Sequence, residues 1–159
     1  MNNSILSQTL FLMKAALTKA ATRTMLIVLH PCSSTAKDIV WYDGSAPVGY
    51  RICEKPSPVV EIALEMFEDD MAAVTGHKAH ARKTAMVEIF QLDRLTNKEM
   101  KELDKRKIKY TDIITRKDAF TISTYNGKIV IIGSNGRGTA YGILELSRMA
   151  GVSPWTDGG

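Results

Sequence analysis

Hydrophobic and polar residues along the chain follow patterns that predict strands and helices in turn. Short apolar runs typical of strands cover residues 38–42, 48–53 and 85–90. Between the second and third runs, Ser57 followed by proline opens a helix that ends before Gly76. Helical spacing of its apolar positions predicts one buried stripe, formed by Val60, Ala63, Leu64, Phe67, Met71 and Val74.

The second half of the chain adds a charged helix, a hairpin and a last helix. Thr96 and Glu99 form a capping box for a helix that runs to about Arg106 and that we expect at the surface. Residues 120–125 and 128–132 are predicted strands, and the Asn-Gly pair between them is typical of a tight hairpin turn. The helix predicted from Thr139 to Ala150, with Gly151 beyond it, is apolar around most of its circumference and needs cover on two sides. This element order predicts an α/β fold with helices packed on a mixed β-sheet.

Composition places these elements in one domain and excludes several classes of protein. The 159 residues are 45% hydrophobic and 24% charged, which is enough apolar material for a core. The net charge of +4 is mild, and basic residues alternate with acidic ones, which argues against a nucleic-acid partner. No apolar stretch approaches the roughly 20 residues that span a bilayer, so we expect no membrane insertion.

Metal and cofactor binding find little support in the sequence. Cys32 and Cys53 have no metal-type neighbours, and we expect two free thiols. His77 and His80 lie three residues apart without a further ligand at suitable spacing, which makes a poor metal site. We therefore expect no metal ion and no cofactor.

Residues 1–36 differ from the rest of the chain and are treated as an N-terminal extension. Basic residues precede a short apolar run at 25–29, and small residues follow at 34–36. This apolar run is shorter than the roughly 7 to 15 residues usual in a signal peptide. A weak export signal, an amphipathic helix over residues 6–25 and disorder all remain open. The folded domain is predicted to cover residues 37–155.

A glycine-rich turn between the last strand and the last helix is the most distinctive motif. Gly133, Gly136 and Gly138 surround the point at which the helix begins, where backbone N–H groups can hold phosphates or carboxylates. Their spacing fits neither a dinucleotide-binding loop nor a P-loop. Two interpretations stay open and are compatible. The glycines permit positive φ in a tight turn, and Arg137 holds an acidic group from a neighbouring domain with its planar guanidinium.

Three other groups of side chains could carry chemistry but have simpler explanations. Glu61, Glu65 and Glu68 share a helical face opposite the buried stripe, so a solvated face is favoured over a catalytic pair. The basic run 105–109 is interpreted as a solvated helix end that complements the helix dipole. The candidate sugar-stacking aromatics, for which core or interface packing is the more common role, are Trp41, Tyr42 and Trp155.

Residues 133–155 carry a resemblance to a known family. They read Gly-Ser-Asn-Gly-Arg-Gly-Thr-Ala-Tyr-Gly-Ile-Leu-Glu-Leu-Ser-Arg-Met-Ala-Gly-Val-Ser-Pro-Trp. This stretch resembles the one that closes the N-terminal domain of glycoside hydrolase family 115, the xylan α-1,2-glucuronidases. Residues 50–54, 61–76 and 117–122 are similar to earlier parts of that domain, so the resemblance covers roughly residues 45–155.

The resemblance implies a domain without catalytic residues. Its fold would resemble the N-terminal accessory domain of α-glucuronidases and hexosaminidases, and residues 156–159 would be the truncated start of a missing catalytic barrel. The catalytic carboxylates of the family lie in that barrel. The domain would support the barrel, and its partners would be the barrel and carbohydrate derived from glucuronoxylan. The parent enzyme is expected to be secreted or periplasmic. Expected ligand or interface residues are Asn135, Arg137, Gly138, Tyr141 and Trp155.

Two other functions remain open beside this one. The chain could be a free-standing module that binds an anionic sugar or phosphate at the 133–138 loop. It could also be a non-catalytic protein that docks on an enzyme encoded elsewhere.

Overall fold

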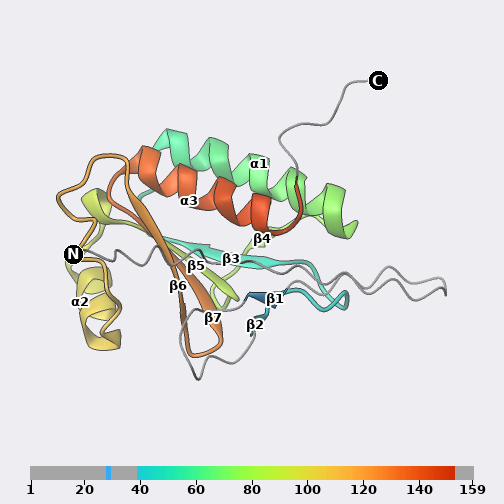
Figure 1. Cartoon of the computed structure of the whole chain (residues 1–159), viewed down its shortest axis with the longest axis horizontal. Helices are drawn as coiled ribbons and strands as arrows, with labels where there is room; N and C mark the ends of the chain where they lie inside the picture. The colour runs from blue at the N-terminus through green and yellow to red at the C-terminus, as the bar shows by residue number, and fades with distance from the viewer. Residues whose placement is uncertain (1–27, 30–38, 153–159) are drawn as a thin grey trace, which may run out of the picture.

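The computed structural model describes residues 28–29 and 39–152, and a five-stranded sheet lies at its centre (Figure 1). The strand order is β4-β3-β5-β7-β6. Four strands run parallel, and β6 is antiparallel to β7. The strands are β3 (Gly49–Ile52), β4 (His80–Ala81), β5 (Val87–Gln91), β6 (Phe120–Tyr125) and β7 (Lys128–Gly133). The predicted α/β fold with a mixed sheet is confirmed.

Helices cover both faces of this sheet. α1 (Pro58–Thr75) and α3 (Gly136–Met149) lie side by side on one face, while α2 (Asn97–Arg106) lies on the other, after the short 3₁₀ helix η1 (Leu92–Arg94) (Figure 1). Strands covered on both faces are apolar along their whole length. This explains why β7 is apolar from Ile129 to Ile132, and why β5 is buried along its whole length although it carries Glu88 and Gln91.

The first core lies between the sheet and the α1–α3 pair. Phe67 and Met71 of α1 are fully buried there, and the Tyr50 ring meets the Phe67 ring edge-on at 6.2 Å between centroids. The predicted buried stripe of α1 is confirmed except at Val74, which is half-buried. Gly142 lets α3 approach the sheet, because a Cβ at this position would lie 2.6 Å from Cγ2 of Ile131. The last helix is therefore covered on two sides, as predicted.

The second core lies on the opposite face and is smaller. Phe90, Val130 and Ile132 of the sheet pack there against Leu103 of α2, which is fully buried. The capping box of Thr96 and Glu99 forms as predicted. The prediction of a surface helix is nevertheless too simple, because Leu103 and Glu99 of α2 are both buried.

Helix boundaries follow the local capping groups. α1 begins after Ser57, as predicted, although the Ser57 hydroxyl makes no capping hydrogen bond, and it ends at Gly76 in the left-handed conformation. α3 begins at Gly136 instead of Thr139, because the side chain of Asn135 caps the helix from the preceding position. The glycines in its first turn had favoured a loop in the sequence-based prediction.

Strand boundaries differ most from prediction near the N-terminus. The run predicted as a strand over residues 38–42 forms only β2 (Ile39–Val40), which pairs with β1 (Val28–Leu29) in a separate two-stranded sheet. Trp41 and Tyr42 are buried in the first core, so they cannot stack on a sugar. Predictions for residues 1–27, 30–38 and 153–159, including Cys32, the export signal and Trp155, lie outside the described residues.

Candidate functional site

The turn between β7 and α3 is held by its own polar groups. The Asn135 Oδ1 atom accepts a hydrogen bond from the Gly138 amide at 2.9 Å, and the Asn135 carbonyl accepts one from the Thr139 amide at 2.9 Å. The Ser134 amide donates to the Ala119 carbonyl at 2.8 Å. Because Asn135 already occupies the Gly138 amide, that amide is not free to bind an anion at the helix N-terminus.

The glycines of this turn serve close packing and not unusual backbone angles. A Cβ at Gly133 would lie 2.2 Å from the Thr139 amide nitrogen, and one at Gly138 would lie 2.3 Å from the Ala119 carbonyl oxygen. A Cβ at Gly136 would meet the hydroxyl of Ser57 at 2.4 Å. None of the three glycines has positive φ. The predicted positive φ is therefore wrong, and the motif fits α3 tightly against its neighbours.

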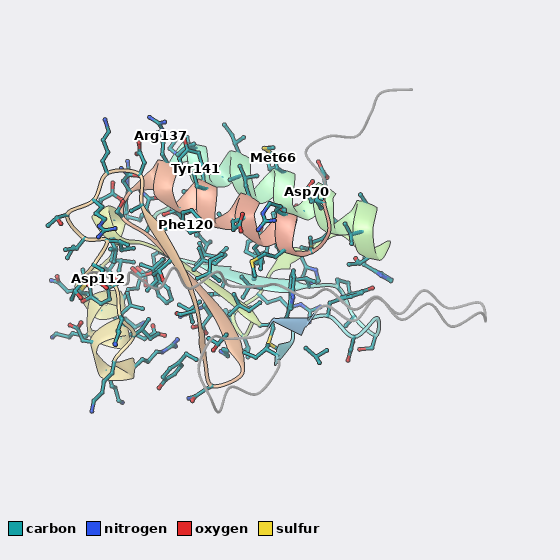
Figure 2. The ribbon with its side chains drawn as sticks, viewed as in Figure 1. Met66, Asp70, Asp112, Phe120, Arg137 and Tyr141 are labelled. Carbon is teal, nitrogen blue, oxygen red and sulfur yellow. The ribbon has the colours of Figure 1, made fainter. Side chains whose placement is uncertain are left out.

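Arg137 and Tyr141 lie on the outward side of α3 (Figure 2), and Arg137 forms an ion pair with Asp118. The Arg137 side chain is 61% exposed, and its Nη1 atom lies 3.4 Å from Oδ2 of Asp118. Its Nη2 atom donates to the Tyr141 hydroxyl at 3.0 Å. The Oδ1 atom of Asp118 accepts a hydrogen bond from the side-chain Nδ2 atom of Asn135 at 3.0 Å. Asn135, Arg137, Gly138 and Tyr141 thus lie together at the start of α3.

Asp118 is the member of this cluster that sequence reasoning missed. The hydrogen bond from Arg137 to Tyr141 and the charge of Asp118 raise the pKa of the Arg137 guanidinium. An anion that approached Arg137 would therefore also meet a carboxylate of the same sign. Asp118 precedes β6 and Arg137 follows β7, so the pairing of the two strands brings these residues to the same end of the hairpin. The predicted hairpin was the only sequence signal for this contact. The cluster suits hydroxyl or amide partners better than a phosphate.

Glu68 is not part of a solvated acidic face. Glu61 and Glu65 are exposed, as predicted, but Glu68 is half-buried and accepts a hydrogen bond from the Tyr50 hydroxyl at 2.6 Å. Burial and this hydrogen bond raise the pKa of Tyr50 well above its ordinary range. The solvated interpretation is therefore wrong for Glu68, which holds α1 to β3.

A buried carboxylate, Glu88, lies on the central strand β5 and faces the second core. It is 2% exposed, and its Oε1 atom accepts from Nζ of Lys128 at 2.7 Å. Its Oε2 atom pairs with Arg106 and lies 3.5 Å from Nη2 of Arg51. Burial alone would raise the pKa of Glu88, but Lys128, Arg106 and Arg51 together hold it below the ordinary value.

This cluster corrects the interpretation of the basic run 105–109. Arg106 is not solvated, because it pairs with Glu88 and Glu102 and lies 5.5 Å from the Tyr125 ring centroid. A general acid in glycoside hydrolysis needs a raised pKa in an open cleft. Glu88 has a lowered pKa and no access to solvent, so its role is to join α2 to the sheet.

The described residues contain neither a metal-binding cluster nor a membrane-spanning helix. Within residues 28–29 and 39–152, no three His, Cys, Asp or Glu side chains cluster in a way that could hold a metal ion. None of the described helices is long and apolar enough to cross a membrane. Cys53 is buried with a free thiol, as expected, and burial raises the pKa of this thiol.

Comparison with known proteins gives an informative match among solved structures. No family model and no curated protein matches the sequence. Among solved structures, a family GH115 4-O-methyl-α-glucuronidase with specificity for decorated arabinogalactans matches with 32% identity and a TM-score of 0.60 over 69% of this chain. The chain resembles a GH115 glucuronidase.

The GH115 resemblance expected from residues 133–155 is thereby confirmed. The chain spans only 14% of the length of that GH115 enzyme. It thus corresponds to a small part of a much larger protein of this kind, and the likeness extends to the sequence as well as to the fold.

Proposed function

We propose that this chain is a non-catalytic N-terminal domain of a GH115-like glycoside hydrolase, and that it supports the catalytic barrel. The match to 14% of a glucuronidase, at 32% identity over most of this chain, carries the proposal. In this role the sheet with its helices is a rigid body on which the barrel rests. The partners are the barrel and glucuronic-acid-bearing carbohydrate.

The proposed parent enzyme removes glucuronic acid side chains from plant polysaccharides. Xylan is the substrate that the motif of residues 133–155 favours. Decorated arabinogalactans are the second choice, because the matched enzyme is specific for them. Such polymers lie outside the cell, so we also propose a secreted or periplasmic enzyme.

The environment of the described carboxylates supports a role without catalysis. Glu88 is buried and has a lowered pKa, while Glu61 and Glu65 lie exposed on a helix. Asp118 is held by Asn135 and Arg137. Glycoside hydrolysis requires two carboxyl groups that flank the bond, one of them with a raised pKa. None of these side chains meets that requirement.

An activity assay of the full chain tests the proposal. The purified protein is incubated with aldouronic acids, glucuronoxylan and a decorated arabinogalactan, and release of 4-O-methylglucuronic acid is measured. We expect no release above a heat-denatured control. Turnover that disappears in Asp118→Asn, or in a variant of another carboxylate within residues 39–152, would overturn the proposal.

Sugar binding at the 133–138 loop is the alternative function. The exposed Arg137 and Tyr141 favour it, whereas the Asp118 carboxylate beside Arg137 disfavours an anionic ligand. Calorimetry with glucuronic acid and with a nucleotide separates the two functions, using Arg137→Ala and the exposed neighbour Lys117→Ala as a control. A supporting domain should bind neither ligand. Binding that only Arg137→Ala removes would favour the binding module.

A further inference from the structure

A second apolar stripe runs along α1 outside the first core. Val59, Ile62 and Met66 are 39%, 58% and 49% exposed. Their spacing of three and four residues places them on one side of the helix, next to each other. Acidic residues flank this stripe: Glu61 and Glu65 lie on one side of it, and Asp69 and Asp70 follow Met66 along the helix. The exposed apolar residues are therefore gathered on one side and not scattered.

α3 continues this apolar surface. Tyr141 is 43% exposed, and Figure 2 shows it on the same outward side of the helix pair as Met66. The first turns of the two helices are in contact, since a Cβ at Gly136 would lie 2.9 Å from Cγ1 of Val59. We call the surface made of Val59, Ile62, Met66 and Tyr141 the α1–α3 outer face. Gathered apolar side chains of this kind mark interaction surfaces.

We propose that the catalytic barrel of the parent glycoside hydrolase docks on the α1–α3 outer face. This inference rests on the proposed function. Aliphatic and aromatic side chains at the centre with an arginine beside them form a composition typical of interface cores. The barrel should therefore present an apolar patch there, with a hydrogen-bond acceptor opposite the exposed Arg137 guanidinium.

The path of the chain favours this face over the α2 face. Gly151 ends α3 in the left-handed conformation, and the Val152 amide donates to the Ser147 carbonyl at 3.2 Å. Residue 152 is thus fixed at the end of α3, so a domain that follows is attached at the helix pair. On the α2 face, Ile114 is the exposed apolar side chain. The charged side chains there pair with one another around Glu88 and link α2 to the sheet.

A chimera tests the inference. This chain replaces the matching part of the GH115 glucuronidase, and the half-life of glucuronidase activity at raised temperature is measured. The test variant carries Ile62→Glu and Met66→Glu. The control carries Ile114→Glu, because Ile114 is 54% exposed, close to the 58% of Ile62, but follows Ile113 of the second core and lies outside the α1–α3 outer face. We expect the test variant to lose activity at least about tenfold faster, since it buries two unpaired charges on docking.

The unfolding midpoint of the isolated full chain should not change in either variant. Equal half-lives for the wild-type and test chimeras would overturn the docking face while leaving the proposed function intact. A chimera without activity even with the wild-type face would contradict the proposed function itself. Sedimentation of the isolated chain tests whether a second copy of the chain occupies this face instead. A dimer that dissociates in the Ile62→Glu, Met66→Glu variant would assign the face to a second copy and overturn the proposal.

Discussion

The two faces of the sheet are covered in chemically different ways. On one face, α1 and α3 bury large apolar side chains, including Phe67 and Met71, and glycines allow backbones to come close. On the other face, α2 contributes one fully buried apolar residue, Leu103. The ion-pair cluster around Glu88 also links α2 to the sheet. The α1–α3 face therefore depends on apolar packing, while the α2 face combines a smaller apolar core with paired charges.

This difference predicts different sensitivities. Apolar packing is indifferent to pH, whereas a buried carboxylate stabilises the fold only while it is ionised and paired. Substitutions on the two faces, each with a matched control, can break or sharpen the comparison.

Truncation in the first core should have the largest effect. Phe67→Ala removes a fully buried ring between α1 and the sheet, and we expect a loss of about 3–5 kcal/mol in the free energy of unfolding. Met66→Ala on the same helix serves as the control, because Met66 is 49% exposed. Urea denaturation measures both. Similar losses in the two variants would contradict tight packing on this face.

Removal of the Glu88 charge should come next. Glu88→Gln leaves Lys128, Arg106 and Arg51 without their shared partner, and we expect a loss of about 2–3 kcal/mol at pH 7. This is less than for a fully buried cluster, since the three cations are 19% to 33% exposed. Glu145→Gln breaks an exposed pair with Arg148 and should cost under about 0.5 kcal/mol.

The same variant gives the sign of a pH effect. The pKa of Glu88 is lower in the folded chain than its ordinary value of 4.5, so the unfolded chain binds the proton more readily. The contribution of ionised Glu88 to the free energy of unfolding is complete at pH values above its ordinary pKa. This contribution is lost as the pH falls through the lower pKa of the folded chain. The stability difference between wild type and Glu88→Gln should therefore shrink in acid. If the stability difference between the two proteins stays constant from pH 7 to pH 3, ionisation of Glu88 is not its origin.

Substitution in the glycine turn should cost less stability than substitution of Phe67 or Glu88. It should still cost clearly more than substitution of the exposed neighbour Arg137. Gly138→Ala places a Cβ 2.3 Å from the Ala119 carbonyl oxygen, a backbone atom that cannot rotate away, and we expect a loss of about 2 kcal/mol. Arg137→Ala, at the preceding position, should leave the stability nearly unchanged because its ion pair is exposed. Thermal unfolding of both variants measures the difference. A harmless Gly138→Ala would mean that α3 can shift away from Ala119.

The smallest effect is expected at the start of α2. Thr96→Ala removes the side chain that accepts a hydrogen bond from the Glu99 amide, which should cost about 1 kcal/mol. Thr115→Ala, at an exposed loop position, is the control and should be neutral. Chemical denaturation monitored by circular dichroism can resolve the two. If Thr96→Ala exceeded Glu88→Gln, the α2 face would depend on capping and not on charge.

Local signals account for the parts of the fold that the sequence predicted well. The apolar period of α1, the capping box at Thr96 and the Asn-Gly hairpin turn each involve residues within one element or turn. The start of α3 was predicted late because the Asn135 cap lies among glycines, which are typical of loops. Boundaries were least accurate where a single capping side chain decides them.

Contacts between distant residues account for what the sequence did not predict. Arg106 was interpreted as solvated because its partner Glu88 lies on another element, 18 residues earlier in the chain. Four candidate site residues were found from one motif, but Asp118, which changes the electrostatics of that motif, comes from the loop before β6. Tertiary pairing of charges leaves no periodic signal in a sequence.

The β6–β7 hairpin also has a consequence for the order of folding. Its two-residue turn, with Asn126 and Gly127 both at positive φ, joins strands that are neighbours in the chain. Hairpins of this kind close in about 1–10 μs, whereas the parallel pairing of Ile89 with Ile131 must first close a long loop. We expect the hairpin to form early and to present β7 as a template, so that its turn also sets the register in which β5 later pairs.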